Sequence, residues 1–229
     1  MKKTVIFDLD GVQADTEPLH RESCRALLRL LHLDESIVSK AYTRSKREFW
    51  SERAKEYGLP FTADELTRRE FALLIEIIEK SGLRPTDGLC ETLENLRAAG
   101  IVCAVASSSD RVYVHTVLET LGLKKYFSAI ACGDEVAAAK PAPDVYLRAL
   151  ALCCAKAEDA AAVEDSDTGI AAAKAAGLFC IGYDAVPEEA YRQKFTLADT
   201  VVHDMRGVFA AATSLQKIGN KRLRIRSKG

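Results

Sequence analysis

The chain has 229 residues, of which 48% are hydrophobic and 28% are charged, a balance typical of globular proteins with a sizeable core. Its 32 basic and 33 acidic residues nearly cancel, so the overall charge gives no reason to expect binding to nucleic acid or to an anionic membrane. No apolar run approaches the roughly 20 residues that cross a bilayer, and we recognise no secretory signal, so we expect a cytoplasmic protein.

The seven cysteines are scattered and mostly have apolar neighbours, as buried thiols in a reducing compartment do. Because they show no Cys-x-x-Cys spacing and only four histidines are present, we expect no zinc site. Basic residues gather at the end of the chain, where we expect a solvated terminus. They are Lys217, Lys221, Arg222, Arg224, Arg226 and Lys228.

The first predicted element is a strand at residues 4–7, Thr-Val-Ile-Phe. These residues are β-branched or aromatic without polar alternation, which is typical of a strand buried on both faces in a parallel sheet. Asp8 and Asp10 follow at once, and Gly11 allows the backbone to turn sharply beside them. Two acids in this position suit either a turn or a functional site.

Residues 17–83 contain helix-like segments but no strand-like run. We therefore predict that they form a helical cap, inserted between the first strand and an α/β core made of residues 1–16 and 84–229. A lid over the ends of the strands is the natural function of such an insertion. The predicted cap helices span residues 20–31, 46–57 and 63–80.

From about residue 84 onward, buried strand-like runs alternate with amphipathic segments of helical length. This alternation indicates right-handed βαβ units, so we predict an α/β fold with a doubly wound parallel sheet. In such sheets ligands bind at the carboxyl ends of the strands. The predicted strands are 101–106, 129–132, 160–163 and 180–183, and the predicted helices are 89–99, 111–121, 144–154 and 168–176.

Acidic residues follow a second buried strand, at Glu164 and Asp165. Ser166, at the next helix start, suits an N-cap, and the acids could serve the same local purpose. However, if Asp8, Asp10, Glu164 and Asp165 meet at one edge of the sheet, their like charges raise one another's pKa and destabilise the fold. A bound cation resolves the repulsion, and carboxylate oxygens suit Mg²⁺.

Two further polar segments end at the same predicted edge. Lys140 precedes prolines that fit a helix start, and it is either simply solvated or placed to neutralise Asp8 and a phosphoryl group. Ser107 offers a hydroxyl, and the backbone N–H groups of Ser108 and Ser109 could bind an anion at the following helix. Serine-rich turns also form for local reasons.

Together, these residues and their order resemble the haloacid dehalogenase-like superfamily. The helical insertion lies where the branch of beta-phosphoglucomutases and phosphoglycolate phosphatases carries its cap, so the resemblance implies a Rossmann-like core with an inserted α-helical cap. The segments that resemble the superfamily's four motifs are 7–12, 106–109, 140–143 and 164–166, and residues 172–177 fit the usual continuation.

The resemblance implies a magnesium-dependent phosphatase with Asp8 as nucleophile and Asp10 as general acid and base. Asp8, the carbonyl of Asp10 and Asp165 would hold Mg²⁺, with Glu164 helping directly or through water, while Ser107 and Lys140 would hold the phosphoryl group. The partner would be a small phosphorylated metabolite, and we expect a monomer or weak dimer. The substrate-binding residues predicted on this basis are Gly11, Thr16, His20, Lys46, Ser107, Ser108, Ser109 and Lys140.

A beta-phosphoglucomutase-type mutase is the alternative. Mutases of the branch carry a glycine-containing cap loop followed by serine and arginine, and a lysine on the last cap helix. Here residues 42–47 lack glycine, and the lysine position falls near Ile75. A basic cluster at Arg44, Lys46 and Arg47 could still meet an anionic substrate or be an ordinary helix end. A dehalogenase is a further alternative, but the second aspartate, Asp10, argues against it. A non-catalytic binding protein on the same scaffold would be expected to lack at least one of the chemical groups, and none is missing.

Overall fold

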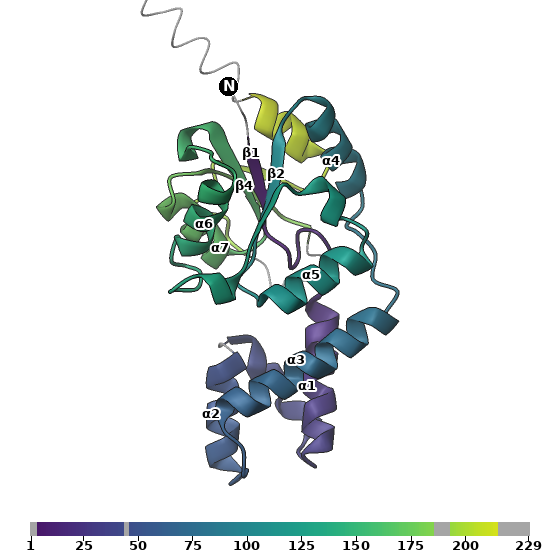
Figure 1. Cartoon of the computed structure of the whole chain (residues 1–229). Helices are drawn as coiled ribbons and strands as arrows, with labels where there is room; N and C mark the ends of the chain where they lie inside the picture. The colour runs from purple at the N-terminus through teal and green to yellow at the C-terminus, as the bar shows by residue number, and fades with distance from the viewer. Residues whose placement is uncertain (1–3, 44–45, 186–192, 215–229) are drawn as a thin grey trace, which may run out of the picture. The chain divides into compact units, whose positions relative to one another are not determined.

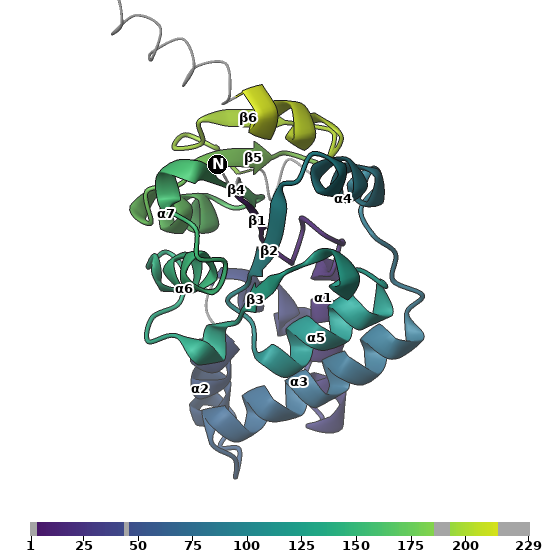
Figure 2. The same ribbon diagram turned by 45° about the horizontal axis from the view of Figure 1, so that its top comes forward.

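In the part of the chain that the structure describes, six parallel strands form a sheet in the order β3-β2-β1-β4-β5-β6 (Figure 2). β1 lies between β2 and β4, with Thr4 beside both Val102 and Ala160. Because all the strands run in one direction, their carboxyl ends share one edge, where ligands bind in folds of this kind. The strands are β1 (Thr4–Phe7), β2 (Val102–Ala106), β3 (Ala129–Ala131), β4 (Ala160–Glu164), β5 (Phe179–Tyr183) and β6 (Thr200–Val202).

The computed structural model describes residues 4–43, 46–185 and 193–214, so Arg44 and the basic tail lie outside the described residues. The chain divides into two compact units, Met1–Asp15 with Arg84–Gly229, and Thr16–Leu83 (Figure 1). We call them the core unit and the helical unit. None of the helices in the described ranges is long and apolar enough to cross a membrane.

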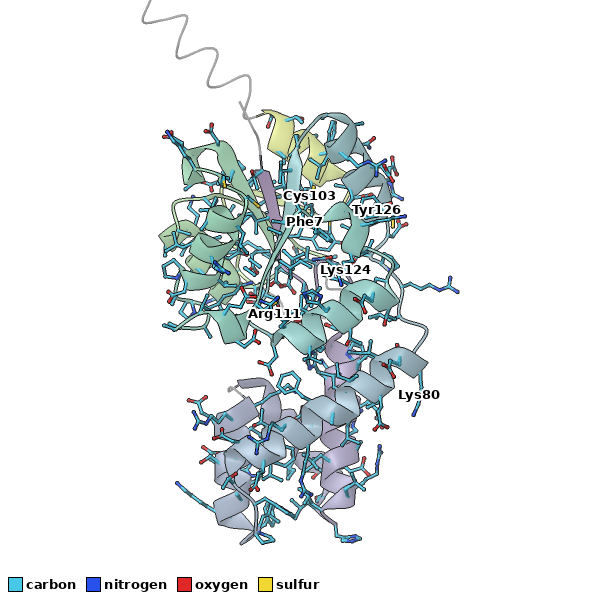
Figure 3. The ribbon with its side chains drawn as sticks, in the orientation of Figure 1. Phe7, Lys80, Cys103, Arg111, Lys124 and Tyr126 are labelled. Atoms are coloured by element: carbon cyan, nitrogen blue, oxygen red, sulfur yellow. The ribbon has the colours of Figure 1, made fainter. Side chains whose placement is uncertain are left out.

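Helices cover both faces of the sheet in the core unit, which explains why the strands lack polar alternation (Figure 1). On one face, Ile6 and Ala162 belong to the same buried cluster as Tyr146 and Ile170 of α6 and α7. Phe7 lies inside the unit and makes an edge contact with Phe127, with ring centroids 6.1 Å apart (Figure 3). The predicted doubly wound α/β fold is confirmed. The helices are α4 (Leu89–Ala98), α5 (Arg111–Thr120), α6 (Asp144–Leu152) and α7 (Asp167–Ala175).

The helical unit consists of α1 (Glu17–Leu30), a 3₁₀ helix η1 (Glu35–Thr43), α2 (Lys46–Glu56) and α3 (Ala63–Lys80). A capping box starts α3, in which the side chains of Thr62 and Glu65 satisfy each other's backbone N–H. Proline in the first turn lets α1 begin a few residues earlier than the apolar periodicity predicts. The unit has its own buried cluster, which comprises Cys24, Leu27, Leu28, Ile37, Val38, Phe49, Trp50 and Leu66.

Sequence patterns missed the last strand, β6, and the helix at 207–214. β6 has only three residues, lies at the edge of the sheet and leaves Val201 38% exposed, so it lacks the buried apolar run that marks the inner strands. Short 3₁₀ turns were also not predicted. They are η2 (Lys124–Tyr126), η3 (Gly133–Glu135) and η4 (Ala157–Asp159).

Candidate active site

Asp8 directly follows the central strand β1, and its backbone is held from two sides. Its N–H donates to the carbonyl of Val163 on β4 at 3.0 Å, and the side-chain amide of Gln13 donates to its carbonyl at 3.1 Å. The residue is only 8% exposed. The end of β1 therefore presents a buried carboxylate on a fixed backbone.

The Lys140 side chain contacts residues at the carboxyl ends of three strands, β1, β2 and β4. Its Nζ donates to Asp8 Oδ1 at 2.5 Å, to Glu164 Oε1 at 2.6 Å and to the carbonyl of Ala106 at 3.1 Å. Burial alone would lower the pKa of this lysine, but Asp8 and Glu164 outweigh burial and raise the pKa above its ordinary value. The two carboxylates therefore favour the charged form of Lys140.

Glu164 is fully buried at the end of β4. Besides Lys140, it accepts hydrogen bonds from the hydroxyl of Tyr146 at 2.6 Å and from Ser166 at 3.3 Å. A Cβ at Gly169 would lie 2.0 Å from the Glu164 carboxylate, so only glycine fits at that point of α7. Burial and the Glu164 charge raise the pKa of Tyr146 well above its ordinary value. Glu164 thus holds the Lys140 ammonium in place by accepting a hydrogen bond from it.

Oxygen atoms of Asp8, Glu164 and Asp165 all lie within 4.8 Å of one another. Burial raises the pKa of Asp8 to about 7, with Lys140 opposing the rise and Glu164 adding to it. Burial and the Asp8 charge raise the pKa of Asp165 well above its ordinary range. Gly11, at φ +74°, leaves room for this group, because a Cβ there would lie 1.9 Å from Asp165 Oδ2. Three carboxylates against one ammonium suit a divalent cation held by oxygen.

The Asp10 side chain is held by groups that differ from those around Asp8. Tyr113 donates its hydroxyl hydrogen to Asp10 Oδ1 at 2.5 Å, and Ser109 Oγ lies 3.5 Å from Asp10 Oδ2. Asp10 itself is partly exposed. It can therefore exchange a proton with a group entering from solvent while one of its oxygens stays fixed.

The serine turn after β2 closes on itself. The N–H of Ser109 donates to Ser107 Oγ at 3.1 Å, so it has a partner within the turn, and its part in binding an anion stays a prediction. With its oxygen accepting that bond, the buried Ser107 hydroxyl can donate its own hydrogen outward. The carbonyl of Ser108 would lie 2.1 Å from a Cβ at Gly133, which makes glycine necessary there.

The remaining predicted residues, Thr16, His20 and Lys46, belong to the helical unit, and their part in substrate binding stays a prediction. Lys46 forms an ion pair with Glu70. Glu70 is 1% exposed and also accepts from Trp50 Nε1 at 2.6 Å. The ammonium of Lys46 therefore already neutralises a buried carboxylate of its own unit.

Three side chains in the site escaped sequence reasoning: Gln13, Tyr113 and Tyr146. Gln13 carried a signal, since it is a polar residue within the mostly apolar stretch 12–14, and it proves to be fully buried. The two tyrosines lie on the apolar faces of α5 and α6, where an aromatic residue looks like any other core residue. Only the fold reveals which carboxylates their hydroxyls meet.

Known proteins resemble this chain over most of its length. A family model described as haloacid dehalogenase-like hydrolase matches residues 2–177. Protein CbbY of Rhodobacter capsulatus is 33% identical, over 92% of this chain and 96% of CbbY. A phosphorylated carbohydrates phosphatase of Thermotoga maritima is 32% identical, over 77% of this chain and 82% of that protein. The crystal structure of a putative beta-phosphoglucomutase from Thermotoga maritima superposes with a TM-score of 0.76 at 26% identity, over 93% of this chain and 99% of that one.

Proposed function

Because this chain belongs to the haloacid dehalogenase-like hydrolases and is a phosphoric monoester hydrolase, we propose that it dephosphorylates a small phosphorylated carbohydrate through a phosphoaspartate at Asp8. The observation that carries the proposal is the buried Asp8 carboxylate in contact with Lys140 at the end of the central strand. The substrate class follows from the similarity to a phosphatase of phosphorylated carbohydrates.

In the first half of the reaction, an oxygen of Asp8 attacks the phosphorus atom, and the bond from phosphorus to the sugar oxygen breaks. Asp10 gives its proton to the departing oxygen, so the sugar leaves as an alcohol. Lys140 stays close to Asp8 and balances the negative charge that the phosphoryl group brings. Ser107 offers its hydroxyl to a phosphoryl oxygen.

In the second half, the deprotonated Asp10 takes a proton from water as the water oxygen attacks phosphorus. The bond between phosphorus and Asp8 breaks, which releases inorganic phosphate and restores the Asp8 carboxylate and the Asp10 acid. General acid and base groups of this kind typically contribute about 10²–10⁴-fold each.

The donor set fits Mg²⁺, since hard carboxylate oxygens converge where the described residues hold more negative than positive charge. Asp8, Asp165 and the backbone carbonyl of Asp10 would hold it. Bound there, it supplies positive charge to the phosphoryl oxygens. We assign Glu164 an indirect part in Mg²⁺ binding, because Lys140, Tyr146 and Ser166 already donate hydrogen bonds to its oxygens.

We expect Mg²⁺ to raise the melting temperature more at about pH 8 than at about pH 5. The folded-state pKa of Asp8, about 7, lies above its ordinary value of 3.8. Between these values the folded chain binds more protons than the unfolded chain, so stability without metal falls as pH rises through this window. Mg²⁺ favours the ionised carboxylate and reverses that loss. Differential scanning fluorimetry at matched ionic strength measures the shifts; equal shifts at both pH values, or an undiminished shift in Asp165→Asn, contradict the metal assignment.

The function is tested with purified protein, Mg²⁺ and a panel of sugar phosphates, with released inorganic phosphate as the readout. We expect release from at least one sugar phosphate, and loss of release after chelation with EDTA that added Mg²⁺ restores. No release from any ester of the panel contradicts the proposal.

A mutase is the second candidate, because a putative beta-phosphoglucomutase shares this fold over nearly its whole length. Against it, the helical unit pairs Lys46 with Glu70, which leaves this lysine less charge to offer a second phosphate. Incubation with beta-glucose 1-phosphate separates the two. Conversion to glucose 6-phosphate without release of phosphate establishes the mutase and overturns the hydrolase.

A further inference from the structure

Tyr113 lies in the first turn of α5, two residues after the helix begins at Arg111. Its side chain is 1% exposed, and its hydroxyl donates to Asp10 Oδ1 at 2.5 Å. The two residues are far apart in sequence, and both belong to the core unit. The contact therefore rests on the fold of one compact unit.

A buried tyrosine hydroxyl needs a partner in any protein, so hydrogen-bond satisfaction alone could explain the contact. This contact is distinctive because it involves one particular oxygen of the Asp10 carboxyl, Oδ1. A protonated carboxyl carries its hydrogen on one oxygen and accepts hydrogen bonds best at the other, so short donation from Tyr113 to Oδ1 favours the proton on Oδ2. Ser109 Oγ lies 3.5 Å from Oδ2, a much longer contact, and a serine hydroxyl can accept as well as donate, so Oδ2 remains the better position for the proton.

We propose that Tyr113 is the positioning residue for the acid and base Asp10, holding Oδ1 so that Oδ2 exchanges the proton with the leaving group and with water. The inference rests on the proposed function, because it needs Asp10 to act in that role. Lys140 anchors Asp8 and Glu164, so two separate donors orient the nucleophile and the acid.

The test compares Tyr113→Phe with Tyr126→Phe. Each substitution removes one hydroxyl that donates to a carboxylate, but Tyr126 meets Glu94 at 2.9 Å on the surface of the core unit (Figure 3). Single turnover with enzyme in excess is followed for 4-nitrophenyl phosphate and for phenyl phosphate. The two esters are similar in size, but nitrophenolate leaves without a proton whereas phenolate needs one.

For Tyr113→Phe we expect about a 10-fold slower turnover of phenyl phosphate and less than about a 2-fold change with 4-nitrophenyl phosphate, because only the proton-dependent departure loses its aligned donor. Tyr126→Phe should change neither rate. In the Asp10→Asn background, adding Tyr113→Phe should cause no further loss that depends on the leaving group.

Equal losses for the two esters, no loss for either, or a further selective loss in the Asp10→Asn background overturns the positioning role. Thermal unfolding accompanies each variant, and rates are compared per folded enzyme, so that equal losses report on the site and not on the amount of folded protein. If wild-type protein hydrolyses neither ester nor any sugar phosphate, the proposed function fails and this inference with it. An active wild type with an unselective Tyr113→Phe overturns the inference alone.

Discussion

The substitution Asp8→Asn is expected to abolish phosphate release, by roughly 10⁴-fold or more, because no other described carboxylate takes the place of this nucleophile at the end of β1. The fold should survive. Burial raises the pKa of Asp8 to about 7, which means that the ionised group costs stability in the folded state, and a neutral asparagine removes that cost. Phosphate release at saturating Mg²⁺ and the melting temperature are the two measurements.

A matched control is Asp184→Asn. Asp184 follows β5 as Asp8 follows β1, but its carboxylate lies beside His203 and not beside Lys140. This variant should keep wild-type turnover. Acid quenching with labelled substrate should trap a phosphorylated protein from wild type and none from Asp8→Asn. Unchanged turnover in Asp8→Asn would mean that the nucleophile is a different residue.

The substitution Lys140→Met has the second largest expected effect, and it acts on both stability and rate. The lysine side chain is 8% exposed and lies between Asp8 and Glu164, whose own side chains are 11% and 0% exposed. Removing the cation leaves these two carboxylates uncompensated and costs about 3–5 kcal/mol of unfolding free energy. Loss of the ammonium beside the phosphoryl group should lower kcat by about 10²–10³-fold.

Urea unfolding and steady-state kinetics separate the two effects. The double variant Lys140→Met/Glu164→Gln should recover part of the unfolding free energy, because the fully buried Glu164 no longer carries a charge, but it should not recover kcat. Lys156→Met is the control, since that lysine side chain is 78% exposed. Recovery of both quantities in the double variant would show that Lys140 acts only as a structural counterion.

Much of the fold could be predicted because parallel sheets covered on both faces leave a plain signal. Buried apolar runs mark β1, β2 and β4, and the polar residues that follow them mark one edge. The direction of the strands is enough to predict that Asp8, Lys140 and Glu164 lie close together. β6 was not predicted, because this short, exposed edge strand lacks a buried apolar run.

Details of the site could not be predicted, because they depend on contacts between residues distant in sequence. The sequence left Lys46 as either a substrate contact or part of an ordinary helix end, and it could not show the ion pair with Glu70 of another helix. It gave no sign that the Ser109 N–H has a partner within its own turn, the hydroxyl of Ser107. In the sequence Tyr113 cannot be told from a core residue, and only the structure shows that its hydroxyl donates to Asp10. Specific hydrogen-bond partners are set by tertiary packing and not by local pattern.

The central position of β1 has a consequence for how the protein is made. β1 leaves the ribosome first, but its partners are Val102 and the following residues of β2 and Ala160 and the following residues of β4. β1 therefore has no strand to pair with while the helical unit is synthesised. That unit has its own apolar cluster and can fold during this time. Parallel pairing across such long separations is slow. We therefore expect the catalytic sheet to assemble only after β4 has been synthesised, when the strand that carries Asp8 inserts between two neighbours that were made long after it.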